Sequence, residues 1–201
     1  KRVALNSLPF SMAVNAAISA LNLSTENILK LHKCGFGGLS ADEVSRLENY
    51  AYLWNIDGKM WQSRWDMSPK GFDISELCES DVKELDEINR LREMAIAPII
   101  EFKNNFKSDA LQMAKAIVRL FEAAEAKSVL NSLCERFKSL ECEITPDVLK
   151  QGYDRFMAVL DSLVNCFGNK TLSVSEFQEA LNLALSIETV GIIPQFIDEV
   201  S

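Results

Sequence analysis

The side chains best suited to chemistry in this 201-residue chain are its single histidine and a cysteine two positions later. A nucleophilic cysteine would use His32 as its base, and a metal ion could bind both His32 and Cys34. Nothing in the sequence orients either group, and a metal centre needs three or four ligands. We therefore predict no catalytic, cofactor-binding or metal-binding residues in this chain.

Two other patterns are similar to ligand-binding loops but fail on position. Gly35–Gly38 is rich in glycine, yet it lacks the Gly-Lys-Ser/Thr ending of a phosphate loop and follows a predicted helix rather than a strand. Residues 161–177 partly resemble the calcium-binding loop of an EF-hand. If Gly168 is its sixth position, the first and twelfth positions are Leu163 and Val174, which cannot bind calcium. We interpret the glycine cluster as a helix-terminating turn and reject the calcium site.

The elements that would position such residues are almost all helical. Apolar residues recur at helical spacing along nearly the whole chain, and strict alternation is nearly absent. Pro98 falls inside one long helical pattern and is expected to kink or split that helix. The expected helix starts are Ser24, Ser40 with Glu43, Asp81 with Glu84, Ser108, Thr145 with Pro146, and Ser173 with Glu176. The pattern predicts an all-α fold, an irregular bundle of about seven to nine helices without an internal repeat.

Residues 55–79 form the least regular stretch of the chain. Three aromatic side chains within it, Trp61, Trp65 and Phe72, predict a long loop pinned to the core rather than a surface that stacks on nucleic-acid bases. We expect a single helical domain over residues 1–201, cut from a longer subunit, with any internal boundary near residues 55–80. Residues 191–196 are expected to be extended and to lead out of the domain.

Charge is unevenly distributed along the chain. The net charge of −8 argues against a free-standing nucleic-acid clamp. Residues 90–138 nevertheless carry nine Lys/Arg against six Asp/Glu, whereas residues 143–201 carry three against nine. If the protein flanks a nucleic-acid path, we expect the contacts from Lys103, Lys107 and Lys115, near an inter-helix turn. Arg90 and Arg92 are expected instead to pair with Glu87 or Glu93.

The five cysteines are odd in number and widely spaced, which favours reduced thiols in a cytosolic protein. No apolar run is long enough to span a bilayer. We therefore expect a cytoplasmic protein without membrane contact and without a small-molecule substrate.

Several short motifs, taken together, resemble a known family. Residues 43–65 are similar to a stretch in the B subunit of AddAB-type ATP-dependent helicase/deoxyribonucleases, and further motifs follow in the same order over nearly the whole chain. The signature residues are Leu47, Glu48, Asn49 and Tyr50, then Ile56 to Gly58 with Trp61, then Asn89 with Arg92 and Pro98, and finally Ile193, Pro194, Asp198 and Val200. Glu199 stands where the family usually has glutamine. None of these motifs is catalytic.

The resemblance implies a non-catalytic helical insertion, similar to the 2B subdomain of superfamily-1 helicases, in a subunit that acts in double-strand break repair and recombination. It implies that the parent subunit uses ATP, magnesium and an iron–sulfur cluster bound outside this chain, and works with a partner A subunit and double-stranded DNA. The alternative is a helical protein–protein interaction module unrelated to DNA.

Overall fold

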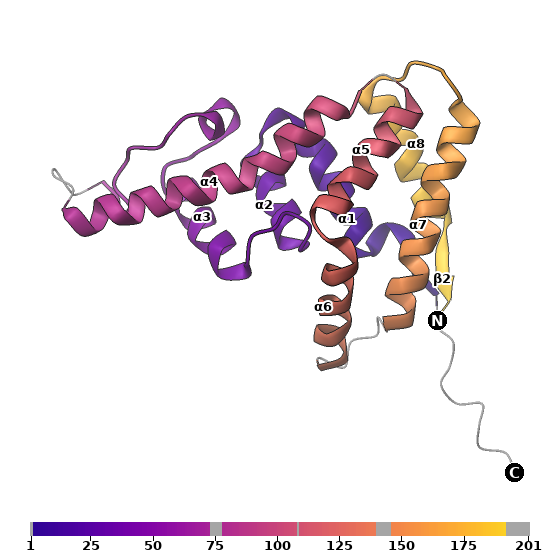
Figure 1. Ribbon diagram of the computed structural model, residues 1–201, viewed down its shortest axis with the longest axis horizontal. Coiled ribbons are helices and arrows are strands. Elements are labelled where there is room, and N and C mark those ends of the chain that lie inside the picture. Colours follow the sequence, from indigo (N-terminus) through magenta and orange to yellow (C-terminus); the bar gives the residue numbers. More distant parts are fainter. Residues whose placement is uncertain (1, 73–77, 108, 140–145, 192–201) are drawn as a thin grey trace, which may run out of the picture.

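The computed structural model describes residues 2–72, 78–107, 109–139 and 146–191. It is 76% helical and contains eight α-helices within those ranges, which confirms the all-α, multi-helix prediction (Figure 1). The helices are α1 (Pro9–Ser19), α2 (Thr25–Lys33), α3 (Ala41–Leu53), α4 (Glu79–Asn105), α5 (Ala110–Ala123), α6 (Ala126–Ser139), α7 (Pro146–Phe167) and α8 (Val174–Ile187). Three short 3₁₀ turns, η1 (Leu5–Ser7), η2 (Ala20–Asn22) and η3 (Gly58–Gln62), connect them.

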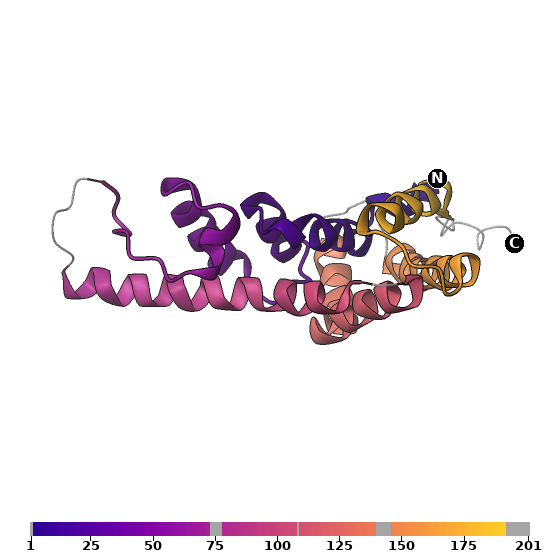
Figure 2. The same ribbon diagram turned by 90° about the horizontal axis from the view of Figure 1, so that it is seen from above.

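Helix α4 is the longest of the described helices and has 27 residues. Figure 2 shows it as one continuous helix along the long axis, with α3 and η3 against its first half and α5 folded back at its far end. Pro98 lies inside α4, so of the two expected outcomes, a kink or a split, the split does not occur. Proline removes one backbone donor from a helix, but α4 continues past it with both α2 and α5 packed against it.

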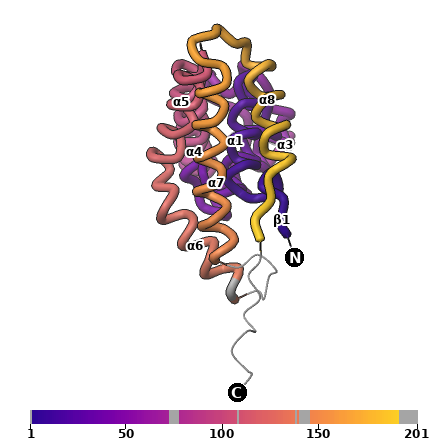
Figure 3. The backbone as a smooth tube through the Cα atoms, turned by 90° about the vertical axis from the view of Figure 1, so that its right-hand side faces the viewer, coloured from indigo at the N-terminus to yellow at the C-terminus, as the bar shows by residue number. Residues whose placement is uncertain are grey.

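A two-stranded antiparallel ribbon joins the two ends of the described chain. Strand β1 (Arg2–Ala4) pairs with β2 (Thr189–Gly191), with Val3 opposite Val190. Figure 3 shows this ribbon at one end of the bundle, beside α8. The sequence pattern did not predict it because a three-residue strand is too short to show alternation. Of the exit segment expected to be extended, only Gly191 lies within the described residues.

Three of the predicted helix starts are confirmed, including Pro146 as the first residue of α7, and others are shifted. Ser40 with Glu43 and Ser173 with Glu176 form complete capping boxes. Helix α4 begins two residues before Asp81, and Asp81 is the third residue of a box whose cap is Cys78. Asp109 caps α5 by accepting from Gln112 N–H at 2.9 Å; Ser108 and Thr145 lie outside the described residues.

The start of α2 is held from elsewhere in the chain. Ser24 occupies the cap position, but its hydroxyl accepts from Asn27 Nδ2 rather than from a backbone amide. The amide of Thr25 instead donates to Asp57 Oδ1 at 2.8 Å, 32 residues away. A tertiary contact thus replaces the local cap that the sequence predicted.

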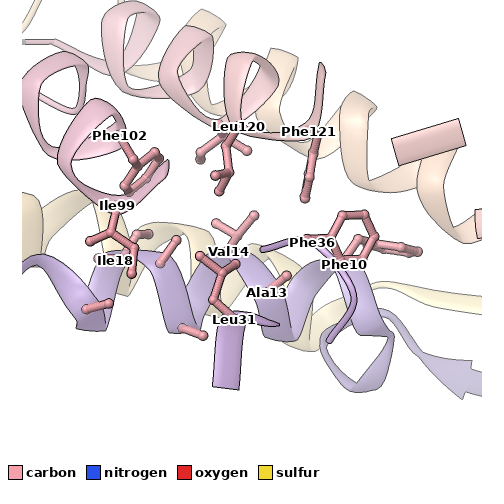
Figure 4. Packing of buried hydrophobic residues seen from close by; sticks show 14 of the residues in the cluster. Phe10, Ala13, Val14, Ile18, Leu31, Phe36, Ile99, Phe102, Leu120 and Phe121 are labelled. Carbon is pink, nitrogen blue, oxygen red and sulfur yellow. The ribbon is translucent and has the colours of Figure 1, made fainter. Parts of the chain in front are cut away.

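The core is built around α1, which is buried on nearly every face. Alanines at 13, 16 and 17 let neighbouring helices approach closely, while its larger residues meet those of α4 and α5 (Figure 4). Phe10 packs against Phe156 of α7 with ring centroids 5.4 Å apart, and Phe121 of α5 lies 5.7 Å from Phe156. Among the described residues, no helix combines the length and hydrophobicity needed to cross a bilayer.

Candidate functional site

The loop between α3 and α4 is tied to α2 by a buried polar network. Trp61 is fully buried, and its indole N–H donates to Thr25 Oγ1 at 2.8 Å. The Thr25 hydroxyl donates in turn to the Ile56 carbonyl. With the Asp57 contact to the Thr25 amide, three bonds hold the loop and the first turn of α2 together. Trp61 is therefore a buried anchor of this loop.

A second group of bonds ties the same loop to α4. Asn89 Oδ1 accepts from Trp65 N–H at 2.8 Å, and Asn89 Nδ2 donates to the Trp65 carbonyl at 2.8 Å. Arg92, also buried, donates from Nη1 to the Trp61 carbonyl at 2.7 Å. Arg92 also pairs with Glu93 at 2.9 Å, as expected, and its guanidinium lies 6.0 Å from the centre of the Trp65 ring. Thr25, Asp57, Asn89 and Arg92 thus attach the loop to α2 and α4.

Aromatic stacking completes the attachment of the loop. Tyr50 stacks on Trp65 with centroids 5.2 Å apart and an interplanar angle of 11°. Its hydroxyl donates to the Met67 carbonyl at 2.8 Å, and burial raises the pKa of Tyr50 to about 12. Phe72 does not pin the loop to the core as expected. It is 75% exposed and rests on Trp54 at the surface.

The surroundings of the other family-signature residues are as follows. Leu47 is fully buried in the core, and Glu48 forms an ion pair with Lys33 at 2.5 Å. Gly58 adopts φ +56°, a region that favours glycine, and its N–H donates to the Leu23 carbonyl at 3.1 Å. Asn49 is exposed on α3. Pro194 and Asp198 lie outside the described residues.

The three lysines singled out for DNA contact lie on α4, in the turn after it and on α5. Lys103 is exposed, but its ammonium donates to the Leu21 carbonyl at 3.0 Å, toward η2. Lys107 lies in the α4–α5 turn and Lys115 on the outer face of α5, both exposed. Arg90, as expected, pairs with Glu87 at 2.7 Å.

Two further cations lie near Lys107 and Lys115 and were missed from the sequence. Arg119 follows Lys115 by one helical turn on the same face of α5 and donates to Asn105 Oδ1 at 2.9 Å. Lys170 comes close to the α4–α5 turn because Asp109 and Thr171 form an isolated antiparallel bridge. Helical spacing could have identified Arg119, whereas only the fold places Lys170.

Among the hydrogen bonds of the described residues, none joins the side chains of His32 and Cys34. His32 is 2% exposed, and its Nε2 lies 3.0 Å from the Ala95 carbonyl, so the N–H is at Nε2. Burial lowers the pKa of His32 and raises the pKa of the Cys34 thiol. Among the described residues, no group of three or more His, Cys, Asp or Glu is placed to hold a metal ion.

These contacts define a helical scaffold, in which buried polar groups hold a loop in place. No family model matches the chain. Over its whole length it is 28% identical to the B subunits of the ATP-dependent helicase/deoxyribonucleases of Clostridium perfringens strain SM101 and Clostridium botulinum strain Langeland. The corresponding protein of Acetivibrio thermocellus is 24% identical over 89% of the chain. These relatives confirm the family resemblance, and the chain spans about 18% of the length of the first two.

Proposed function

We propose that this chain is a helical domain of a helicase–nuclease subunit acting in DNA break repair and recombination, and that it positions other parts rather than catalysing a reaction. The proposal rests on one observation. The whole chain is similar to helicase/deoxyribonuclease B subunits, and it spans about 18% of their length. ATP, magnesium and an iron–sulfur cluster would then be bound by the remaining parts of the parent subunit. Its partners would be an A subunit and double-stranded DNA in the cytoplasm.

The ribbon supports a single domain whose first and last strands lie side by side, where the domain would be attached to the rest of the parent subunit. Strands β1 and β2 pair at one end of the bundle, so the chain enters and exits side by side. Helix α4 follows any boundary near residues 55–80, yet it packs against α2 and α3, which precede that boundary, as well as against α5, which follows it. One cooperative domain over residues 1–201 is the organisation we propose.

For DNA contact we propose the exposed face formed by Lys107 and Lys115, extended by Arg119 and Lys170. Lys103 lies toward η2 and its ammonium is already bonded, so we expect it to contribute less. With a net charge of −8 the chain should bind duplex DNA weakly, with a dissociation constant no tighter than roughly 10⁻⁴–10⁻⁶ M.

A salt titration of duplex binding tests this proposal. Exchange of Lys103, Lys107 and Lys115 for glutamate should weaken binding and reduce the salt slope, by about one for each lysine that contacts a phosphate. The matched control exchanges Lys30, Lys59 and Lys150, also exposed, and changes the net charge equally. Equal loss in both triple variants would remove this face from the DNA path.

The absence of catalysis is tested separately. The purified chain should hydrolyse neither ATP nor DNA when magnesium is supplied. DNA cleavage that disappears when carboxylates of this chain are exchanged for amides would contradict a positioning role.

A protein-interaction module remains the second candidate. Within the described ranges, three large apolar side chains are more than two-thirds exposed: Phe72 at 75%, Ile187 at 74% and Leu183 at 68%. Exposed apolar side chains that occur in groups mark protein contacts, and Leu183 and Ile187 lie one turn apart on α8. Binding to a polypeptide without any measurable DNA affinity would favour this candidate.

A further inference from the structure

A groove lies where α5, α6 and α7 meet, on a part of the molecule that the family signature does not touch. The three helices pack against one another in pairs, and the groove between them has a volume of about 560 Å³. Its apolar lining comes from Val118 and Phe121 of α5 and from Tyr153 and Met157 of α7. Phe121 is buried, whereas Val118, Tyr153 and Met157 are half-exposed. The groove therefore offers an apolar floor to an incoming side chain.

The rim of this groove is negatively charged. Glu122 and Glu125 line it and are exposed, and Lys127 is the one lysine or arginine in the described lining. Glu125 adopts φ +49°, which holds its backbone in a tight turn between α5 and α6. Neither carboxylate has an ion-pair partner within the described part of the chain. Two unpaired carboxylates over an apolar floor select for an apolar group flanked by positive charge.

Tyr153 supplies a polar group inside the groove. In the described part of the chain its hydroxyl makes no hydrogen bond, although its ring packs on Phe10 and Phe121. Burial raises the pKa of Tyr153, and the charges of Glu122 and Asp154 raise it further. The phenol therefore stays protonated and can donate a hydrogen bond to a carbonyl oxygen.

We propose that the α5–α6–α7 groove is a docking site for a partner polypeptide that inserts one apolar side chain flanked by lysine or arginine. The apolar side chain would lie on Phe121 and Met157, its cationic neighbours would pair with Glu122 and Glu125, and Tyr153 would donate to its backbone. Nucleic acid is disfavoured here because phosphates would face the two carboxylates. The proposal concerns the groove and its carboxylates rather than the lysines, and goes beyond the proposed DNA role.

Methionine methyl signals in NMR test this directly, because Met157 lines the groove and the other methionines do not. The probe is a short capped peptide with one leucine between two arginines, and the control peptide has glutamates in place of the arginines. The first should shift the Met157 signal saturably, with a dissociation constant of roughly 0.1–1 mM for so small a contact. The exposed Met60 and Met94 should not move, and the control peptide should not bind.

Charge reversal identifies the rim. The double variant Glu122→Lys/Glu125→Lys should bind the arginine peptide at least roughly fivefold more weakly. The matched control Glu135→Lys/Glu179→Lys carries the same charge change outside the groove and should keep the affinity. An unchanged signal from the buried Met113 shows that each variant is folded.

Three results would overturn the proposal. One is a Met157 signal that does not respond to the arginine peptide at millimolar concentration. Another is equal binding of both peptides or of both double variants. The third is a short DNA duplex that shifts Met157 more strongly than the peptide, which would make the groove a nucleic-acid contact.

Discussion

The carboxamide of Asn89 bonds both backbone groups of Trp65, accepting from its N–H and donating to its carbonyl, each at 2.8 Å. A single side chain thus satisfies both backbone groups of one residue, as a neighbouring strand does in a β-sheet. It holds the middle of a long loop on α4, 24 residues away. Because Trp65 is buried, its backbone groups have little access to water and depend on Asn89.

Exchange of Asn89 for leucine should destabilise the fold by about 2–4 kcal/mol, because it leaves two buried backbone groups unpaired. Urea denaturation measures the loss. Asn104 lies on the same helix and is exposed, so Asn104→Leu is the control and should change stability by less than about 0.5 kcal/mol. Equal stability of the two variants would show that the loop does not depend on this contact.

Trp61→Ala should cost about 3–5 kcal/mol, since it empties a fully buried site and removes the bond to Thr25. Trp61→Phe keeps most of the apolar volume and should cost less. Phe72→Ala in the same loop is the exposed control and should barely change the melting temperature. An unchanged melting temperature for Trp61→Ala would contradict the anchor.

Stability should fall as the pH is lowered from about 7.5 through 6.5 and below. Burial lowers the pKa of His32 in the folded state, so below its ordinary value of 6.5 the unfolded chain takes up a proton that the folded chain resists. The contribution of the neutral, buried His32 to the free energy of unfolding is present above pH 6.5. It is lost as the pH falls toward the pKa of His32 in the folded state. Because the chain has one histidine, His32→Gln should remove this slope in thermal melts. A slope that persists in the variant would assign it to other groups.

Gly37→Ala should destabilise the fold by about 1–3 kcal/mol through overpacking. A Cβ at this position would lie 2.2 Å from His32 Nδ1, and the imidazole is held by Ala95. At Gly191 a Cβ would meet nothing within 4 Å, so Gly191→Ala is the matched control. Thermal melts that do not separate the two variants would show that the imidazole can move aside.

The amino-acid sequence by itself determined the helical class and the interior face of most helices. Apolar residues at three- and four-residue spacing leave one stripe to bury, and this holds whatever the helix packs against. The boxes at Ser40 and Ser173 were equally readable, because a capping box is completed within four residues. The burial of Trp61 followed from an indole in a loop between two helices, although its bonding partners did not.

Only the tertiary structure decided the contacts that join distant segments. The cap of Thr25 by Asp57, the pairing of Asn89 with Trp65 and the ribbon of β1 with β2 each join residues at least 24 positions apart. The bond between the Lys103 ammonium and the Leu21 carbonyl is also of this kind, since it joins residues 82 positions apart. Periodicity and capping act over one or two turns of helix. The direction of a side chain beyond that range depends on how the helices pack, and that is settled by the shape of the whole core.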